Sequence, residues 1–306
     1  MIKRRTVLVL GAGASAPYGF PCARDLRDKI ISGLSKEIAQ PFQLLVAAGF
    51  DAQHVTNFRD ALQKSGQASV DVFLEHRSEF LPVGKTAIAA ALIPYEDEAK
   101  LWGGDQNWYE YLWQRLGPSL LDDVAQSQLS VITFNYDRSL EHFLFSALRE
   151  SHNLGTDYAA RYLREIIRIV HVHGQLGPLP WADTGFGNGR SYQPHDPANL
   201  KDAAVAAAKG IRIVHESAKD DPQYVQARQL LAQAEIVIFL GFGYLRENVE
   251  RLAIRSLSPN IALIGTAYGL MEGERAEVAL VVSERLFLGN LRHGVLEFLR
   301  THRLLI

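Results

Sequence analysis

The sequence predicts an α/β fold, a Rossmann-like parallel sheet with helices on both faces and a helical insertion. Short apolar runs recur along the chain and end in glycine or polar residues, which is typical of strands buried on both faces. Segments with helical spacing of apolar residues separate these runs, and this alternation favours a parallel sheet. One long stretch, residues 41–123, has no convincing strand pattern and is interpreted as a helical insertion or subdomain.

Two periodicities, of about 2 and 3.6 residues, assign the individual elements. Strands are predicted at residues 6–10, 129–134, 167–172, 235–240 and 261–264, with a weaker one at 211–214. Helices are predicted at 22–35, 74–80, 87–92, 108–121, 138–148 and 222–234, from about 247, and at 288–299. Residues 176–200 are rich in Gly, Pro, Asp and Asn and are interpreted as a loop. Because ligands of open parallel sheets bind at the carboxyl ends of the strands, the residues after each strand are the candidates for function.

Composition argues against several classes of protein. The 306 residues are 47% hydrophobic and 22% charged, as in an ordinary globular protein, and one domain over 1–306 is expected. The net charge of -2 gives no electrostatic footprint for direct nucleic-acid binding. Cys22 is the single cysteine, so an internal disulfide and a four-thiolate zinc site are both impossible. The apolar run near the N-terminus is too short for a signal peptide or membrane helix, and a cytoplasmic protein is expected.

The first candidate motif, GAGASA at residues 11–16, directly follows the first predicted strand. It fits G-x-G-x-x-G/A, in which the absence of side chains lets backbone N–H groups approach a pyrophosphate. The alternative is a tight turn that binds no ligand. A nicotinamide dehydrogenase would next need a second strand ending in Asp or Glu, ≈ 20 residues on, but that region is predicted to be helical.

The second motif places Asn135 and Asp137 at the end of the next predicted strand. Side chains two residues apart can face one cleft and offer amide and carboxylate groups to a carboxamide, a ribose or a water. The alternative is that either residue only caps the helix that begins near Arg138.

The third motif, His171-Val172-His173-Gly174, ends another predicted strand. Strand alternation predicts that both histidines point to one side, and the glycine lets the chain leave the sheet sharply. Histidine suits general-base catalysis at neutral pH, although a structural role is the alternative. Two histidines also suggest a metal, but a third ligand is not evident and no metal site is predicted.

The fourth motif places Gly241 and Gly243 after the strand at 235–240. These glycines could present a second set of backbone amides to a phosphate or ribose. A plain strand-to-helix turn is the alternative.

Together the four motifs, in this order and spacing, resemble the SIR2-like (sirtuin-like) superfamily. The matching elements are G-A-G-x-S at 11–15, T-x-N-x-D at 133–137, H-G at 173–174 and G-x-G at 241–243. The surrounding residues, including 13–21, are more similar to the bacterial branch associated with antiphage defence. The resemblance does not include the stretches 41–123 and 176–210.

The resemblance implies an NAD site and a role for each matching residue. Gly11, Ala12, Gly13 and Ser15 would hold the phosphates and the adjoining ribose, Asn135 and Asp137 would lie at the nicotinamide end, His173 would be the general base, and Gly241 and Gly243 would close over the ribose or phosphate side. His171 matches no catalytic position of the family and would be a supporting residue.

One departure from the family pattern shapes the expected activity. Sirtuins that deacylate proteins carry four zinc cysteines, and this chain has one cysteine, so use of NAD as the substrate is favoured. The expectation is an NAD glycohydrolase, without zinc, that releases nicotinamide and ADP-ribose in antiphage defence. The alternatives are an ADP-ribosyltransferase or deacylase, a non-enzymatic sensor of NAD or ADP-ribose, and a scaffold subunit. A homo-oligomer is expected, and an ATPase or an Argonaute-like protein is the partner that the resemblance suggests.

Overall fold

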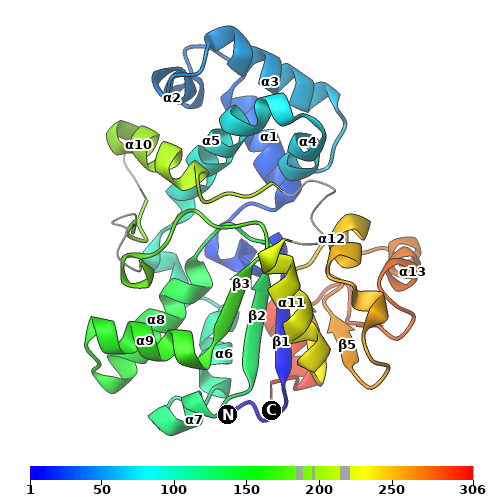
Figure 1. Ribbon diagram of the computed structural model, residues 1–306. Helices are drawn as coiled ribbons and strands as arrows, with labels where there is room; N and C mark the ends of the chain where they lie inside the picture. Colours follow the sequence, from blue (N-terminus) through cyan, green and yellow to red (C-terminus); the bar gives the residue numbers. More distant parts are fainter. Residues whose placement is uncertain (184–188, 195–196, 214–220, 306) are drawn as a thin grey trace.

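The computed structural model describes residues 1–183, 189–194, 197–213 and 221–305. Within these ranges six strands form an all-parallel sheet in the order β3-β2-β1-β4-β5-β6 (Figure 1). The strands are β1 Thr6–Leu10, β2 Leu129–Thr133, β3 Arg168–His171, β4 Ile236–Leu240, β5 Ala262–Gly265 and β6 Phe287–Leu288. This order is that of the dinucleotide-binding Rossmann sheet, and it confirms the predicted α/β class. The strand order reverses between β1 and β4.

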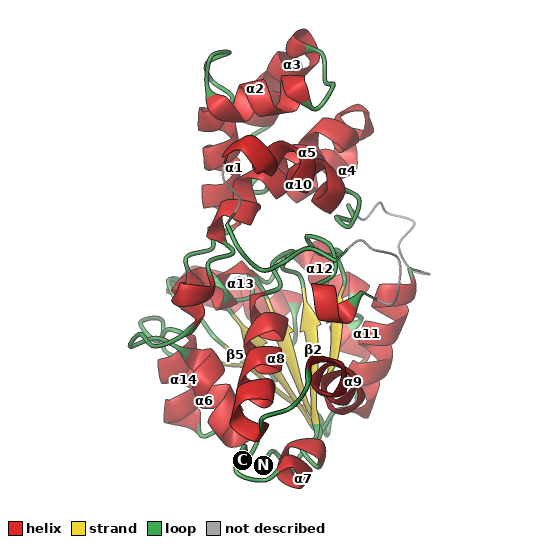
Figure 2. Ribbon diagram, turned by 90° about the vertical axis from the view of Figure 1, so that its left-hand side faces the viewer, coloured by secondary structure: helices red, strands yellow, loops and turns green. Residues whose placement is uncertain are grey.

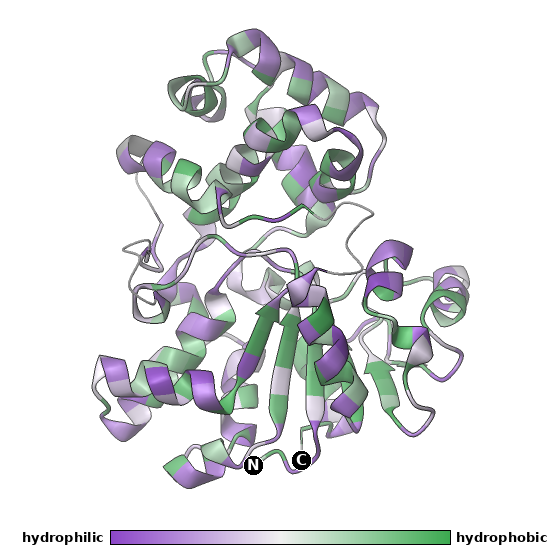
Figure 3. Cartoon of the chain, in the orientation of Figure 1, coloured by the Kyte–Doolittle hydropathy of each residue, from purple (hydrophilic) through white to green (hydrophobic). Residues whose placement is uncertain are grey.

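The central strands are apolar because both of their faces are covered. Every residue of β1 and of β4 is buried, and β1 pairs in register with both neighbours, Leu10 lying opposite Thr133 on one side and Leu240 on the other. Figure 3 shows these strands as a hydrophobic centre between more polar helices. All these strands end at one edge of the sheet, so the turns that follow them are brought together.

Helices cover both faces of the sheet, as predicted. On one face, Leu8 and Leu10 share an apolar cluster with α6 Trp108–Arg115, α8 Ser139–His152, α9 Thr156–Ile166 and α14 Val295–His302. On the other, Val7 and Val9 share a second cluster with α11 Pro222–Gln233, α12 Arg246–Arg251 and α13 Glu272–Val281. No helix in the described ranges combines the length and apolar character needed to cross a bilayer.

A separate group of helices lies over the carboxyl ends of the strands (Figures 1 and 2). We call it the helical roof; it comprises α1 Ala23–Gly33, α2 Gln40–Ala47, α3 Ala52–Lys64, α4 Val70–His76, α5 Leu81–Leu92 and α10 Pro197–Ala208. Helix α5 is its centre, since α1, α2, α3, α4 and α10 all contact it. Residues 41–123 are thus helical, but they are divided between two places. Helices α2–α5 belong to the roof, whereas α6 covers a face of the sheet and the short α7, Leu121–Ala125, follows it.

The helix predicted at 108–121 is shorter than expected. It ends at Arg115, and Gly117 follows in the left-handed region with φ of +78°, next to Pro118. A left-handed glycine followed by proline is a helix-terminating pair, and helical periodicity alone does not register it.

Two further predictions near the C-terminal half need correction. The weak strand at 211–214 is wrong for its described part, where Ile211 makes only an isolated bridge with Gly174; Val214 lies outside the described residues. The helix predicted at 288–299 begins only at Val295, because Leu288 belongs to β6 and Gly294 precedes the first helical turn.

Candidate functional site

A cavity of about 900 Å³ lies between the strand ends and the helical roof, at the point where the strand order reverses. Its floor is formed by the turns after β1, β2 and β4, and α4 contributes to the opposite wall. The structure brings every candidate residue onto this one cavity: Gly11, Ala12, Gly13, Ser15, Asn135, Asp137, His173, Gly241 and Gly243. The volume is at the upper end of the range of roughly 300–1,000 Å³ for small-molecule and cofactor sites.

The glycines after β1 and β4 are required by contact between the two turns. The Gly11 amide donates to the Leu240 carbonyl at 3.1 Å, and the Gly13 amide donates to the Gly241 carbonyl at 3.0 Å. A Cβ at Gly11 would lie 2.5 Å from the Gly241 oxygen, and one at Gly241 would lie 2.1 Å from the Ala14 nitrogen. Gly241 also has φ of +56°, which disfavours a side chain. Contact between the two turns therefore explains the glycines at positions 11, 13 and 241 without any ligand.

Gly243 differs from the other glycines of the floor. It lines the cavity, and a Cβ placed on it would meet no described atom within 4 Å. It does not have a positive φ. Neither packing nor a positive φ requires glycine here, and its bare backbone leaves this part of the cavity open to a ligand.

The turn after β1 does not lead directly into an α-helix. Two short 3-10 turns, Ala12–Ala14 and Ala16–Tyr18, come first, and α1 begins at Ala23. The first turn of α1 still reaches the cavity, through Ala23 and Arg24. The backbone of the 3-10 turn Ala12–Ala14, and not only the N-terminus of α1, would therefore contact an anionic ligand.

Asp137 holds the floor together from beneath. Its Oδ2 accepts from Ser15 Oγ at 2.7 Å, and its Oδ1 accepts from the Ser139 amide at 3.1 Å and from the Ser139 hydroxyl. Burial raises the pKa of Asp137, and the hydrogen bonds from Ser139 and Ser15 act against that rise. The alternative interpretation of the sequence, in which Asp137 caps the helix, is therefore correct in part, because Asp137 accepts a hydrogen bond from the amide of Ser139, the first residue of α8. It also fixes Ser15, and both of its oxygens are engaged.

Asn135 is oriented by the same network. Its Nδ2 donates to the Gly11 carbonyl and to Ser15 Oγ, both at 3.0 Å. Because a carbonyl oxygen can only accept, these contacts define which side-chain atom is the nitrogen. Among the described residues, no group donates to Asn135 Oδ1, and the residue lines the cavity. Oδ1 is thus left as an acceptor for a ligand hydroxyl or a water.

The two histidines of the third motif do not face the same side, contrary to the prediction. Strand β3 ends at His171, and a turn begins at Val172, so the alternation of strand side chains stops there. His171 contacts Glu141 on α8, on one side of the sheet, whereas His173 contacts Tyr224 on α11, on the other. Only His173 lines the cavity.

His173 is a neutral imidazole at pH 7. Burial and, to a smaller extent, the positive charge of Arg251 lower its pKa to about 4, while Glu75 and Asp221 act in the opposite direction. Its Nε2 lies 3.1 Å from the Tyr224 hydroxyl, and the ring packs edge-on against Phe134. A neutral ring can accept a hydrogen bond or a proton, but with this pKa it is a weaker base than an ordinary histidine.

Helix α4 of the roof reaches across the cavity through two acidic residues. Asp71 accepts a hydrogen bond from the Tyr136 hydroxyl, next to Asn135. Glu75 forms a two-pronged ion pair with Arg251 of α12, with N···O distances of 2.8 and 2.9 Å. Arg251 also bonds to Tyr224, the partner of His173, so the roof is connected to the His173 side chain.

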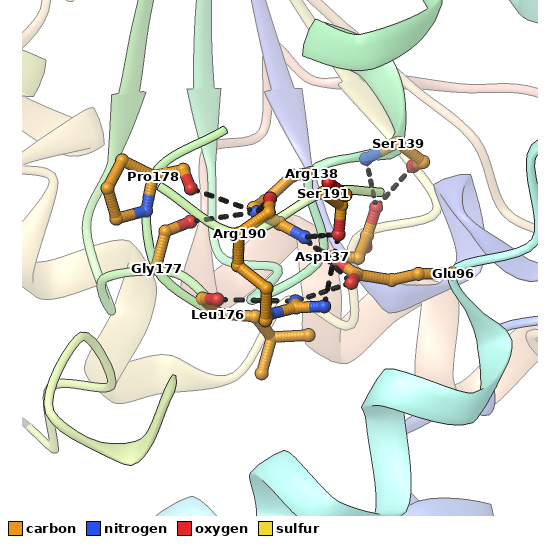
Figure 4. Close-up of polar contacts among 9 residues, drawn as sticks. All are labelled: Glu96, Asp137, Arg138, Ser139, Leu176, Gly177, Pro178, Arg190 and Ser191. Atoms are coloured by element: carbon orange, nitrogen blue, oxygen red, sulfur yellow. Dashed lines mark hydrogen bonds and ion pairs between the residues drawn. The ribbon is translucent and has the colours of Figure 1, made fainter. Parts of the chain in front are cut away.

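A buried ion cluster anchors the roof at a second place (Figure 4). Glu96, which follows α5, is fully buried and pairs with Arg138 at the start of α8, at 2.7 and 2.8 Å, and with Arg190. Arg138 is also fully buried and donates to the carbonyls of Gly177, Pro178, Arg190 and Ser191. Glu96, Arg138 and Arg190 thus join the roof, the turn after β2 and the segment after β3.

Sequence reasoning missed several residues of the cavity. Arg24 and Arg292 line it and are exposed. Thr266 and the two acidic residues of α4, Asp71 and Glu75, also line it. Thr266 accepts from the Gly241 amide at 2.9 Å and so helps hold the left-handed turn. The threonine after the strand at 261–264 could have been found by applying the strand-end rule once more, whereas nothing in the sequence indicates that α4 crosses the cavity.

In the part of the chain that the structure describes, no group of three His, Cys, Asp or Glu side chains is arranged to hold a metal ion. Cys22 is partly buried and lines the cavity. No protein-family model matches the chain, and no curated protein matches it.

Proposed function

We propose that this cavity binds NAD and that the protein hydrolyses the bond between nicotinamide and ribose. The observation that carries the proposal is the convergence of the candidate residues from four strand ends on one cavity at the strand-order reversal. That reversal is where open α/β sheets bind dinucleotides. Bare glycine backbone, two exposed arginines and a polar cluster with an open amide oxygen are the chemistry that a pyrophosphate and a ribose require.

Each part of the floor has its own task in this proposal. The backbone of Ala12 and Gly243, together with Arg24 or Arg292, binds the phosphates and the adjoining ribose. Gly11, Gly13 and Gly241 keep the two turns in contact, and Asp137 fixes Ser15 and the Asn135 turn. Asp137 is thus a positioning residue and not a group that reacts.

Bond cleavage requires a group that orients water at the anomeric carbon. Asn135 Oδ1 accepts a hydrogen bond from the water, and neutral His173 accepts its proton as the new C–O bond forms. Nicotinamide leaves with the electron pair of the broken C–N bond, and the carboxylates of the cavity stabilise the positive charge that develops on the ribose. General-base help of this kind contributes roughly 10²–10⁴-fold.

A second candidate is a non-enzymatic receptor for NAD or ADP-ribose. Two observations favour it, the low pKa of His173 and the engagement of both Asp137 oxygens, since each weakens the acid–base chemistry available in the cavity. In this alternative the same floor binds the nucleotide, and the roof changes its contacts in response.

The experiment incubates purified protein with NAD and separates nicotinamide and ADP-ribose by chromatography, for wild type, Asn135→Ala and His173→Ala. We expect release by the wild type and a loss of at least about 100-fold in each variant. Binding of NAD without release supports the receptor. Full release by both variants contradicts the roles assigned to Asn135 and His173, and absence of both binding and release contradicts the NAD site.

The resemblance to the antiphage branch extends the proposal to cell physiology. NAD hydrolysis in the cytoplasm would deplete the cofactor of an infected cell, with activation through homo-oligomerisation or a partner such as an ATPase or Argonaute-like protein. Phage challenge of cells carrying wild type or Asn135→Ala, with cellular NAD measured over time, tests this extension.

A further inference from the structure

A histidine–glutamate pair lies directly behind the Asn135 turn, outside the cavity. His171 Nδ1 is 3.0 Å from the main-chain oxygen of Asn135, and His171 Nε2 contacts the Glu141 carboxylate. The two side chains are 11% and 15% exposed, so this contact is largely shielded from water. His171 comes from the end of β3, where it pairs with Thr133 at the end of β2, and Glu141 comes from the first turn of α8; the turn that carries Asn135 joins β2 to α8.

The partners of the ring determine its protonation. A carbonyl oxygen and a carboxylate both accept hydrogen bonds, so both ring nitrogens must carry a proton if both contacts are satisfied. His171 is then an imidazolium paired with Glu141. Burial disfavours this charge, but Glu141, the Asn135 carbonyl and the nearby Asp137 outweigh burial and raise the pKa of His171. The charged groups that dominate the shift, Glu141 and Asp137, are acidic.

Asn135 is therefore held from two directions. Its side-chain amide is fixed to the Gly11 carbonyl and Ser15, and its main-chain carbonyl is fixed to His171. The contact with His171 restrains the carbonyl of the peptide after Asn135, in addition to the bonds that hold Tyr136 and Asp137.

We propose that the Glu141–His171 pair is the positioning element for Asn135, and that it makes the activity of the site depend on pH. The part that concerns activity rests on the proposed function. When the ring loses a proton, one of its nitrogens faces an acceptor oxygen with no hydrogen between them. This weakens either the contact with the Asn135 carbonyl or the contact with Glu141. The rate of NAD cleavage then falls as the pH rises through the pKa of His171.

The variants are Glu141→Gln, which keeps the shape and removes the charge, and His171→Gln. The matched control is His142→Gln on the same helix, since His142 also faces a carboxylate, Glu98 at 3.3 Å, but has a pKa lowered mainly by burial and does not line the cavity. We expect kcat to fall about 10- to 100-fold in Glu141→Gln and His171→Gln, with KM nearly unchanged. In both variants the rate of NAD cleavage should no longer fall as the pH rises. The control keeps the wild-type profile.

Equal kcat and equal pH profiles in Glu141→Gln and wild type would overturn the proposal. A variant that does not fold is recognised by its thermal transition, and Glu141→Gln is the milder of the two.

Two readouts by NMR are independent of NAD. In wild type at about pH 7, both His171 ring nitrogens should be protonated while His142 is neutral. Hydrogen exchange of the amides at 134–137 should be roughly 5-fold faster in Glu141→Gln than in wild type or His142→Gln, as expected for loss of one hydrogen bond. A neutral His171 or unchanged exchange refutes the pair as a positioning element.

If both NMR readouts give the expected result but NAD neither binds nor is cleaved, the proposed function has failed and the positioning element stands.

Discussion

The floor and the roof of the cavity are held in place by different kinds of contact. Within the floor, the turns after β1 and β4 meet backbone to backbone, through glycines 11, 13 and 241, with no charged side chain in their contact. The roof is attached by ion pairs between side chains, above all Glu75 to Arg251 at the cavity and Glu96 to Arg138 away from its lining. Backbone contact gives a fixed surface, whereas the attachment of the roof depends on charges that substitution or pH can change.

The largest effect is expected where the roof is anchored by buried charge. Arg138→Met removes both bonds to Glu96 and leaves a buried carboxylate with Arg190 as its remaining cation. We expect a loss of about 3–5 kcal/mol in the free energy of unfolding. Urea denaturation measures it, and Arg149→Met, at an exposed pair on the same helix, is the control. A loss below about 1 kcal/mol would show that the ion cluster is not what attaches the roof.

The next effect is expected in the floor. Gly241→Ala places a methyl group 2.1 Å from the Ala14 nitrogen at a φ of +56°, so a backbone must move. The left-handed conformation costs about 1–2 kcal/mol and overpacking about 1–3 kcal/mol, which together predict a loss of roughly 2–5 kcal/mol. Gly243→Ala should lie within about 0.5 kcal/mol of wild type. Equal stability of the two variants contradicts the assignment of backbone contact to Gly241.

A smaller and pH-dependent effect is expected from His173. Because its folded pKa is about 4 and the ordinary value is 6.5, the unfolded chain takes up the proton first. Its contribution to stability is complete above pH 6.5 and is lost as the pH falls toward 4, by about 2 kcal/mol at pH 5. The stability difference between wild type and His173→Gln should therefore shrink by this amount on acidification. A difference that stays constant between pH 7 and 5 would argue that His173 is not buried as a neutral ring.

The same contrast explains what could be predicted from sequence. The buried strands and the turns of the floor carry local signals: an apolar run, then glycine at positions where a Cβ would collide, as at Gly11. Short-range patterns therefore predicted the parallel sheet and the floor residues that converge on the cavity. They did not reveal that β3 stops at His171, which separates two histidines that strand alternation places together.

The roof could not be predicted in the same way because its contacts are distant in sequence. Glu75 meets Arg251 across 176 positions, and Tyr136 meets Asp71 across 65. A single sequence contains no pattern that pairs such residues. Helices α10 and α13 were also missed. The first begins at the end of the segment 176–200 that composition marked as a loop and continues to Ala208, and the second follows a strand end at Thr266 that was not followed further.

Calorimetric titration of NAD into wild type, Gly243→Val and Gly273→Val tests whether NAD lies against the bare backbone of the floor. Neither glycine has a neighbour that a Cβ would meet within 4 Å, but only Gly243 lines the cavity. We predict that Gly273→Val binds NAD as the wild type does, while Gly243→Val folds normally and binds at least about 10-fold more weakly, a change of about 1.4 kcal/mol. Unchanged binding of NAD by folded Gly243→Val would contradict this position of NAD.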